Sequence, residues 1–146
     1  MSTPLRRLND VAYWVIEDPA LISGFINANI RREWEADARS EGRDPSSDSW
    51  LQDLPYRRWS LETVQITKVR LNPNTVEFVD DRRGYRFADS LAKRTVSLRT
   101  AIETCATVIW PLVVRAEDMQ LMDGHCRYST LKMTEVPQAY AYVSRH

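Results

Sequence analysis

The hydrophobic pattern in the first part of the chain predicts one long amphipathic helix. Asp18 and Pro19 form a typical helix start, a capping acid followed by proline at the first helical position, and Gly42 is a typical stop. Between these residues, apolar side chains recur at helical spacing, at Ile22, Phe25, Ile26, Ile30 and Trp34. We therefore predict a helix over residues 19–41.

The segments on either side of this helix have no regular pattern. Residues 11–17, VAYWVIE, are apolar on all sides and too short to assign. Residues 42–60 are rich in turn formers, including Pro45 and Pro55, and predict a loop. The loop carries Trp50 and Trp59, which either pack back onto the domain or form a surface for a partner.

From Thr63 onward the pattern changes to that of a sheet. Val64 and Ile66 alternate with polar residues, and Val69 and Leu71 continue the alternation one step out of phase. A strand with a bulge is the expected result, since one extra residue shifts the alternation.

The rest of the chain alternates between helical and strand-like patterns. Helical spacing predicts helices over 86–94 and 97–106. Short apolar runs predict strands at VIWPLVVR, MQLMD and AYAYV, with a helix that begins near residue 126 between the last two. Together these elements indicate an α/β (α+β) domain over residues 61–146. It follows a helical N-terminal extension and loop over residues 1–60.

Composition and charge exclude several classes of protein. The chain has 20 Lys and Arg against 20 Asp and Glu, and this balance argues against a protein that coats nucleic acid or an anionic membrane. No apolar run approaches the roughly 18 residues of a membrane span, and the first ten residues lack the apolar segment of a signal peptide. Cys105 and Cys126 form no CxxC pair. We therefore expect a cytoplasmic protein without a disulfide framework or structural zinc.

Candidate chemistry gathers where the strand MQLMD meets the last predicted helix. A helix start presents unpaired N–H groups and the positive end of the helix dipole, so it attracts anions. Gly124 allows the backbone to approach a ligand closely, and His125 and Arg127 add donors suited to phosphate. Asp123, at the carboxyl end of its strand, can hold Mg²⁺ or accept a proton. An Asx-type cap at a tight turn, with Arg127 solvated, fits the same residues, and spacing alone leaves both interpretations open.

Residues 110–143 resemble the conserved half of the ParB/sulfiredoxin-like domain. They contain a Pro-Leu-Val-Val strand, a Gly-x-x-Arg-Tyr junction, and a Val-Pro before the last strand. The upstream VQITKVRLNPN is similar to the opening strand of that family. The resemblance covers residues 61–143, whereas residues 1–60 have no counterpart. It implies a small mixed sheet with flanking helices, and binding of a nucleotide, either ATP or CTP.

Within this superfamily the junction is most similar to that of the free-serine kinases. They read Asp-Gly-His-His-Arg, and only Cys126 departs from that pattern, where it replaces a histidine. Sulfiredoxins place a nucleophilic cysteine directly after the glycine, where this chain has His125, so the resemblance does not imply sulfinic acid reduction. Chromosome-partitioning members usually read Gly-Glu-Arg-Arg and continue into a helix-turn-helix, which this sequence does not show.

The kinase resemblance implies ATP-dependent phosphoryl transfer to a small hydroxylated metabolite such as an amino acid, or nucleotide hydrolysis. Asp123 would bind Mg²⁺ and, with His125, take part in catalysis. An acid after the first strand would take the proton, with Glu77 as the nearest candidate and Asp80 or Asp81 as alternatives; Glu77 also fits a solvated loop carboxylate. The resemblance places these residues at the nucleotide: Pro111, Gly124, His125, Cys126, Arg127, Tyr128 and Ser129.

A second function of a different class fits the same sequence. The protein would then be a nucleotide-binding regulatory module that contacts a protein partner, or a second copy of itself, through residues 1–60. Turnover of nucleotide with a small acceptor would separate the two functions. In either case we expect that Arg127→Ala weakens nucleotide binding about tenfold or more and changes fold stability little, since a phosphate-facing arginine is not packed in the core.

Overall fold

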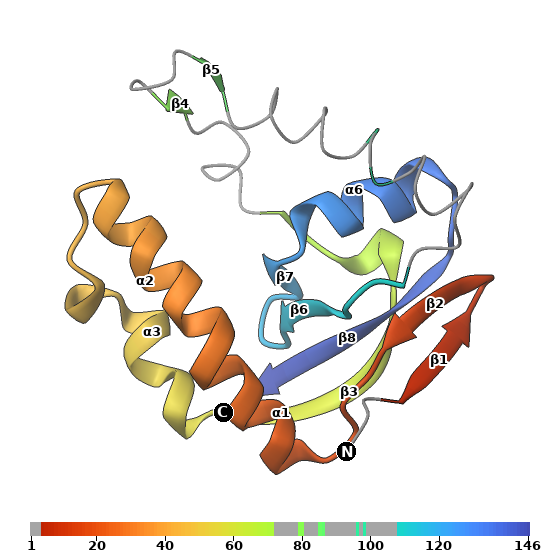
Figure 1. The fold of residues 1–146 in the computed structure, drawn as a ribbon, viewed down its shortest axis with the longest axis horizontal. Coiled ribbons are helices and arrows are strands. Elements are labelled where there is room, and N and C mark those ends of the chain that lie inside the picture. The colour runs from red at the N-terminus through yellow and green to blue at the C-terminus, as the bar shows by residue number, and fades with distance from the viewer. Residues whose placement is uncertain (1–3, 72–78, 81–84, 87–95, 97, 99–107) are drawn as a thin grey trace.

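The centre of the molecule is a four-stranded mixed sheet. The computed structural model describes residues 4–71, 79–80, 85–86, 96, 98 and 108–146. The strands lie in the order β3-β8-β6-β7. They span Arg58–Gln65 (β3), Gln138–Arg145 (β8), Leu112–Arg115 (β6) and Gln120–Asp123 (β7). β8 is parallel to β6, and the other two pairings are antiparallel. Helix α6 (His125–Met133) connects β7 to β8, so the predicted mixed α/β fold is confirmed (Figure 1).

The N-terminal residues form a hairpin that joins this sheet's core. Strands β1 (Leu5–Leu8) and β2 (Val11–Trp14) are antiparallel, and Asn9 and Asp10 between them both have positive φ, as a two-residue hairpin turn requires. β2 continues toward the segment before β6, where the amide of Trp14 donates to the carbonyl of Ile109 at 2.9 Å. The segment 11–17 therefore contains a strand. Its apolar pattern has no period because β2 is almost wholly buried.

The predicted helix over 19–41 is confirmed, with a local change of type in its middle. It consists of α1 (Pro19–Phe25), a π-helical segment (Ile26–Ile30) and α2 (Arg31–Ser40). Asp18 caps it as expected, accepting from the amide of Ala20 at 2.9 Å.

The prediction of a loop over 42–60 is wrong. The segment contains two 3₁₀ turns, Pro45–Ser47 and Leu54–Tyr56, on either side of α3 (Ser49–Asp53), and β3 begins at Arg58. Pro45 is the first residue of one 3₁₀ turn and Pro55 the second residue of the other, and at both positions the missing N–H of proline costs little. Asp44 and Asp48 cap the first 3₁₀ turn and α3.

The shift in the hydrophobic alternation after Ile66 comes from a turn, and not from the predicted bulge. β3 ends at Gln65, and a 3₁₀ turn over Ile66–Lys68 follows. Arg70 then forms an isolated bridge with Gln120 of β7. The predicted strands near 112–115, 120–123 and 138–145 and the helix after Gly124 are confirmed.

The middle of the chain is described only in part. Strands β4 (Val79–Asp80) and β5 (Tyr85–Arg86) pair with each other, so Arg86 is not helical. Val96 and Leu98 have helical backbone. The rest of the two helices predicted over 86–94 and 97–106, with Cys105, lies outside the described residues. Among the described residues, no helix is long and apolar enough to cross a membrane.

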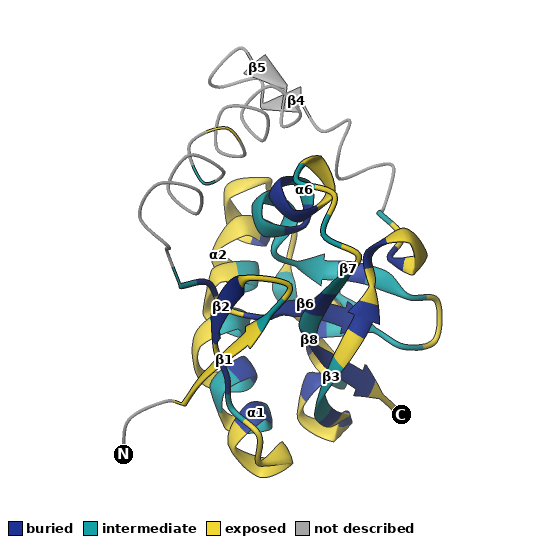
Figure 2. Cartoon of the chain, turned by 90° about the vertical axis from the view of Figure 1, so that its right-hand side faces the viewer, coloured by how far each residue is buried: buried dark blue, intermediate teal, exposed yellow. Residues whose placement is uncertain are grey.

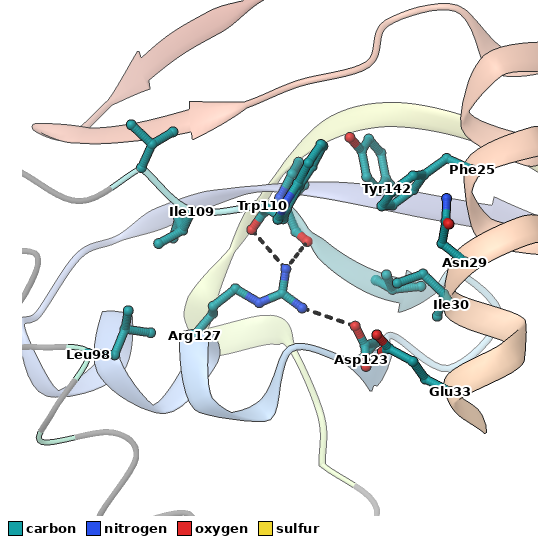
Figure 3. Close-up of a pocket in the computed structure, with 13 residues that line it drawn as sticks. Phe25, Asn29, Ile30, Glu33, Leu98, Ile109, Trp110, Asp123, Arg127 and Tyr142 are labelled. Carbon is teal, nitrogen blue, oxygen red and sulfur yellow. Dashed lines mark hydrogen bonds and ion pairs between the residues drawn. The ribbon is translucent and has the colours of Figure 1, made fainter. Parts of the chain in front are cut away.

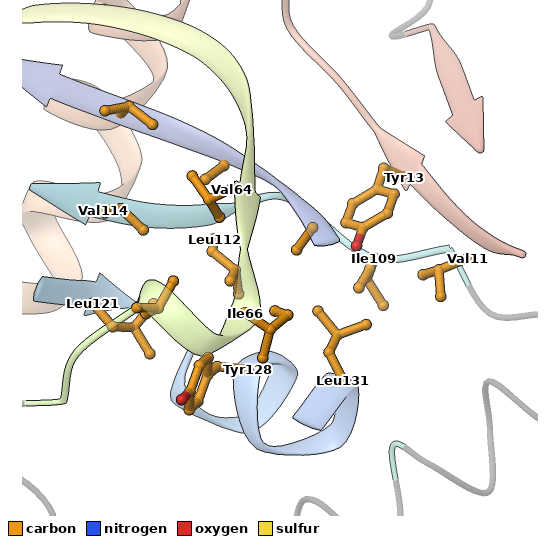
Figure 4. Close-up of a cluster of buried hydrophobic side chains, with 14 of the residues drawn as sticks. Val11, Tyr13, Val64, Ile66, Ile109, Leu112, Val114, Leu121, Tyr128 and Leu131 are labelled. Carbon is orange, nitrogen blue, oxygen red and sulfur yellow. The ribbon is translucent and has the colours of Figure 1, made fainter. Parts of the chain in front are cut away.

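The sheet separates two hydrophobic clusters. The first lies between the sheet, β2 and α6, and contains Leu112 and Val114 of β6 (Figure 4). The second lies under the N-terminal helices and contains Val113 of β6 and Tyr142 of β8. Neighbouring residues of β6 thus enter opposite clusters, as the alternation of a strand requires. Figure 2 shows this buried sheet under partly exposed helices.

Residues on both sides of position 60 build these clusters. β2 contributes Val11 and Tyr13 to the first cluster, and the N-terminal helix contributes Ile22 and Ile26 to the second. Trp59 belongs to the second cluster and is 3% exposed, and Trp50 packs against this cluster. Both tryptophans therefore pack back onto the domain. The boundary predicted at residue 60 thus falls inside β3 and crosses both clusters.

Candidate functional site

The junction between β7 and α6 depends on a glycine. Gly124 is the residue that caps the start of α6, and its φ of 94° lies in the left-handed region. A Cβ atom at this position would lie 2.8 Å from Nη2 of Arg127. The left-handed backbone conformation therefore favours glycine, and a Cβ atom here would also force the guanidinium of Arg127 to shift. As the N-cap residue, Gly124 contributes no side chain to cap the start of α6.

The side chain of Arg127 links the start of α6 to the segment that leads into β6 by hydrogen bonds. Its Nη1 donates to the carbonyls of Trp110 at 3.0 Å and Pro111 at 2.8 Å, and its Nη2 donates to Oδ2 of Asp123 at 3.0 Å (Figure 3). The side chain is 19% exposed. The alternative of a capping Asp123 with a solvated Arg127 is therefore wrong. The premise that Arg127 faces a phosphate and has no partners in the fold is also contradicted, so a small effect of its loss on stability is no longer expected.

A pocket of about 410 Å³ borders this junction. One wall comes from the N-terminal helix, a second from the segment that leads into β6, and Asp123 and Arg127 lie between them (Figure 3). The lining consists of Phe25, Asn29, Ile30, Glu33, Leu98, Val108, Ile109, Trp110, Pro111, Val113, Asp123, Arg127 and Tyr142. The pocket thus joins residues from both ends of the chain.

Three aromatic rings line the pocket. Phe25 stacks on Trp110 with ring centroids 5.1 Å apart and an interplanar angle of 22°, and it meets Tyr142 edge-on at 6.2 Å. Burial raises the pKa of Tyr142 to about 12, so its hydroxyl stays neutral, and this hydroxyl accepts from the amide of Ile16 at 3.2 Å. Phe25 therefore contacts both other rings, and Trp110 lies at the exposed edge of the pocket.

Glu33 is the carboxylate that the sequence interpretation missed. It lies across the pocket near Asp123 (Figure 3). Burial raises the pKa of the Glu33 carboxyl, and the charges of Asp123 and Asp37 add to this, while Arg127 partly offsets it. The pKa of Asp37 is also raised, by burial, by Glu41 and by Asp123. In the sequence, Glu33 follows Phe25 and Asn29 at intervals of four residues, which places the three on one helical row but does not connect that row to Asp123.

The structure brings only some of the predicted site residues to the pocket. Pro111, Asp123 and Arg127 line it. Gly124, His125, Cys126 and Ser129 are half-buried at the junction and in the first turns of α6, and they do not line the pocket. Tyr128 is buried in the first hydrophobic cluster. Glu77 and Asp81 lie outside the described residues, and so does the side chain of Asp80 in β4. The roles assigned to all these residues stay predictions.

The described residues contain no ready-made metal centre. Among them, no group of three or more His, Cys, Asp or Glu side chains is placed to hold one ion. Asp123 is therefore a candidate to supply a single carboxylate to Mg²⁺, an ion that usually keeps several waters and binds through one or two carboxylates plus substrate phosphates.

No family model matches this chain, and no curated protein matches it. Among solved structures, the chain is similar to one crystal form of a Pnob8-like ParB-N domain, with 15% identity and a TM-score of 0.43 over 62% of this chain and 31% of that chain. It is also similar to a pNOB8-like ParB N-domain, with 21% identity and a TM-score of 0.38 over 60% of this chain and 28% of that chain. The chain thus spans about a third of the length of these matches.

Proposed function

We propose that this protein binds a nucleotide together with Mg²⁺ at the junction of β7 and α6. The observation that carries the proposal is the start of α6, where the N-cap residue Gly124 adopts a left-handed conformation and contributes no side chain of its own. A helix start of this kind offers N–H groups and a positive dipole to phosphate oxygens. The adjacent pocket of about 410 Å³ has the size and the mixed aromatic and polar lining of a small-molecule site.

The charges around the junction are the reason why this proposal includes a metal ion. Glu33 and Asp123 both line the pocket, and two carboxylates repel phosphate. Arg127 offsets one of them, yet its Nη1 is bonded to the carbonyls of Trp110 and Pro111 and its Nη2 to Asp123. Asp123 would hold Mg²⁺, and the charge of the ion would offset this repulsion and attract phosphate. We therefore expect nucleotide binding to be weak in the absence of Mg²⁺.

ATP-dependent phosphoryl transfer to a small hydroxylated metabolite is the more specific form of this proposal. It gains support from Glu33, a carboxylate in the same pocket as the candidate metal ligand, where it could hold an acceptor in place. Glu77, Asp80 and Asp81 stay the proposed candidates for the base that takes the proton from the acceptor hydroxyl. A nucleotide-binding regulatory module without turnover is the alternative, and ParB N-domains are the similar solved structures.

Nucleotide titrations separate these possibilities. Calorimetry with ATP and CTP, with and without Mg²⁺, tests binding, and a pooled metabolite phosphorylation assay then tests turnover. Binding with turnover supports the kinase form, and binding without turnover supports the regulatory module. If neither nucleotide binds in Mg²⁺, the proposed function is wrong.

Asp123→Asn tests the metal role. Asparagine can still accept from Arg127, so the free variant should melt close to the unmodified protein. Asparagine is a weaker ligand for a hard cation, so Mg²⁺-nucleotide affinity should fall about tenfold or more, with a corresponding loss of ligand-dependent stabilisation in thermal shift. Asp118→Asn is the matched control, since Asp118 pairs with Arg115 in the β6–β7 turn and does not line the pocket. Equal ligand-dependent stabilisation in both variants would exclude Asp123 as a metal ligand.

Cys126→Ser tests whether the thiol takes part in chemistry. Cys126 is half-buried in the first turn of α6 and does not line the pocket. We expect nucleotide affinity and any turnover to stay within about threefold, because serine preserves shape and only the nucleophile is lost. The measurements are the same titration and assay. Complete loss of activity, with a covalent adduct in the unmodified protein detected by mass spectrometry, would instead show thiol catalysis.

A further inference from the structure

The pocket beside the junction has aromatic faces and a negative charge. Phe25, Trp110 and Tyr142 supply the rings, and Trp110 is 36% exposed at this surface. The face of an aromatic ring attracts cations, most strongly in tryptophan. Aromatic rings together with carboxylates form the usual environment for an ammonium or guanidinium group.

The charged lining residues make the preference for a cation specific. Among the described lining residues there are two carboxylates, Glu33 and Asp123, and one guanidinium, Arg127. The charge of the guanidinium is paired within the protein, because its Nη2 donates to Asp123, and its Nη1 donates to two backbone carbonyls. Glu33 is therefore the lining charge without an arginine bonded to it, and it would repel a ligand carboxylate and attract a ligand ammonium group.

We propose that this pocket recognises an organic amine with an apolar body, and that the acceptor is therefore an amino alcohol and not an amino acid. This inference rests on the proposed function for the existence of an acceptor hydroxyl, and it names the acceptor's chemical class. The ammonium group would lie between Glu33 and the exposed part of Trp110, since the facing sides of Phe25 and Trp110 cover one another. The apolar body would contact Ile30 and Ile109, which also line the pocket.

The N-terminal helix sets this specificity. Phe25, Asn29 and Glu33 follow one another at intervals of four residues and all line the pocket. In a regular α-helix of 3.6 residues per turn, such a row drifts around the axis. The π-helical segment Ile26–Ile30 has wider turns and offsets this drift, so the row stays aimed at one cavity. Residues 1–60, which have no counterpart in the family that the sequence resembles, thus supply the wall that selects the ligand.

Three matched probes test the inference with the full chain and no nucleotide. L-phenylalaninol carries the ammonium group, 3-phenylpropan-1-ol has the same skeleton without it, and L-phenylalanine adds a carboxylate. We expect calorimetry and tryptophan fluorescence to show phenylalaninol binding about tenfold or more tighter than the other two, since only it gains the charge and cation–π attraction. Equal affinity for the three probes, or tighter binding of phenylalanine, would overturn the inference.

Glu33→Gln should weaken phenylalaninol binding about tenfold and so remove most of the preference for this probe, because the substitution removes the charge and keeps the shape. The control is Glu35→Gln on the same helix. Glu35 bonds to Arg31 at 2.8 Å and does not line the pocket, so that variant should keep the preference within about twofold. An unchanged preference in Glu33→Gln would also overturn the inference.

These results separate the two proposals. Phenylalaninol selectivity without any Mg²⁺-nucleotide binding would support amine recognition and reject the proposed function. Nucleotide binding without discrimination among the probes would reject amine recognition alone.

Discussion

Replacing Ile26 with alanine should lower the free energy of unfolding by about 3 kcal/mol, within the range of about 2–5 kcal/mol for large-to-small changes in a core. Ile26 is 0% exposed and packs in the second hydrophobic cluster with Val113 and Tyr142 of the sheet. The loss combines the transfer of the removed methyl and methylene groups with the cavity they leave. Urea denaturation followed by circular dichroism measures it, provided that the slope of the transition is unchanged.

Leu21→Ala is the control for this change. Leu21 lies on the same helix, is 58% exposed, and should change stability by no more than about 0.5 kcal/mol. The comparison decides whether the first sixty residues are part of the domain's core or an addition to it. Equal, small effects of the two substitutions would mean that the N-terminal helix does not share the core in solution.

Arg127→Ala should lower the free energy of unfolding by about 3 kcal/mol. The substitution removes three hydrogen bonds and leaves the Asp123 carboxylate and the carbonyls of Trp110 and Pro111 without their partner. Leaving a half-buried charge unpaired costs more than the pair itself contributes, with losses of about 3–5 kcal/mol for fully buried pairs. Partial exposure of Arg127 places the expected value at the lower end of that range. Urea denaturation is again the measurement.

Arg145→Ala provides the contrast. Arg145 pairs with Glu62 at the surface, where its side chain is 47% exposed, and loss of such a pair changes stability by at most about 1 kcal/mol. If Arg127→Ala were no more destabilising than Arg145→Ala, Arg127 would be available for a ligand in the free protein. In the opposite case, part of any loss of nucleotide affinity in Arg127→Ala would come from the displaced junction.

The candidate site shows where sequence interpretation stops. Gly124 and its neighbours could be singled out because a strand, a glycine and a helix follow one another directly in the chain. Glu33 could not be assigned to the site, because it lies 90 positions before Asp123 and nothing local connects them. Arg127 was identified as a donor, but its acceptors are backbone carbonyls of Trp110 and Pro111, which carry no side-chain signal.

The sequence alone determined the elements whose pattern is periodic and whose ends carry their own signals. The helix from Pro19 and the strands β6, β7 and β8 are of this kind, since amphipathic spacing and capping are properties of neighbouring residues. Only the tertiary structure decided that residues 11–14 form a strand, because burial in the first cluster erases the alternation that would reveal it. It also decided that the helix carrying Glu33 closes the pocket at Asp123, since packing across the sheet depends on contacts between residues far apart in the chain.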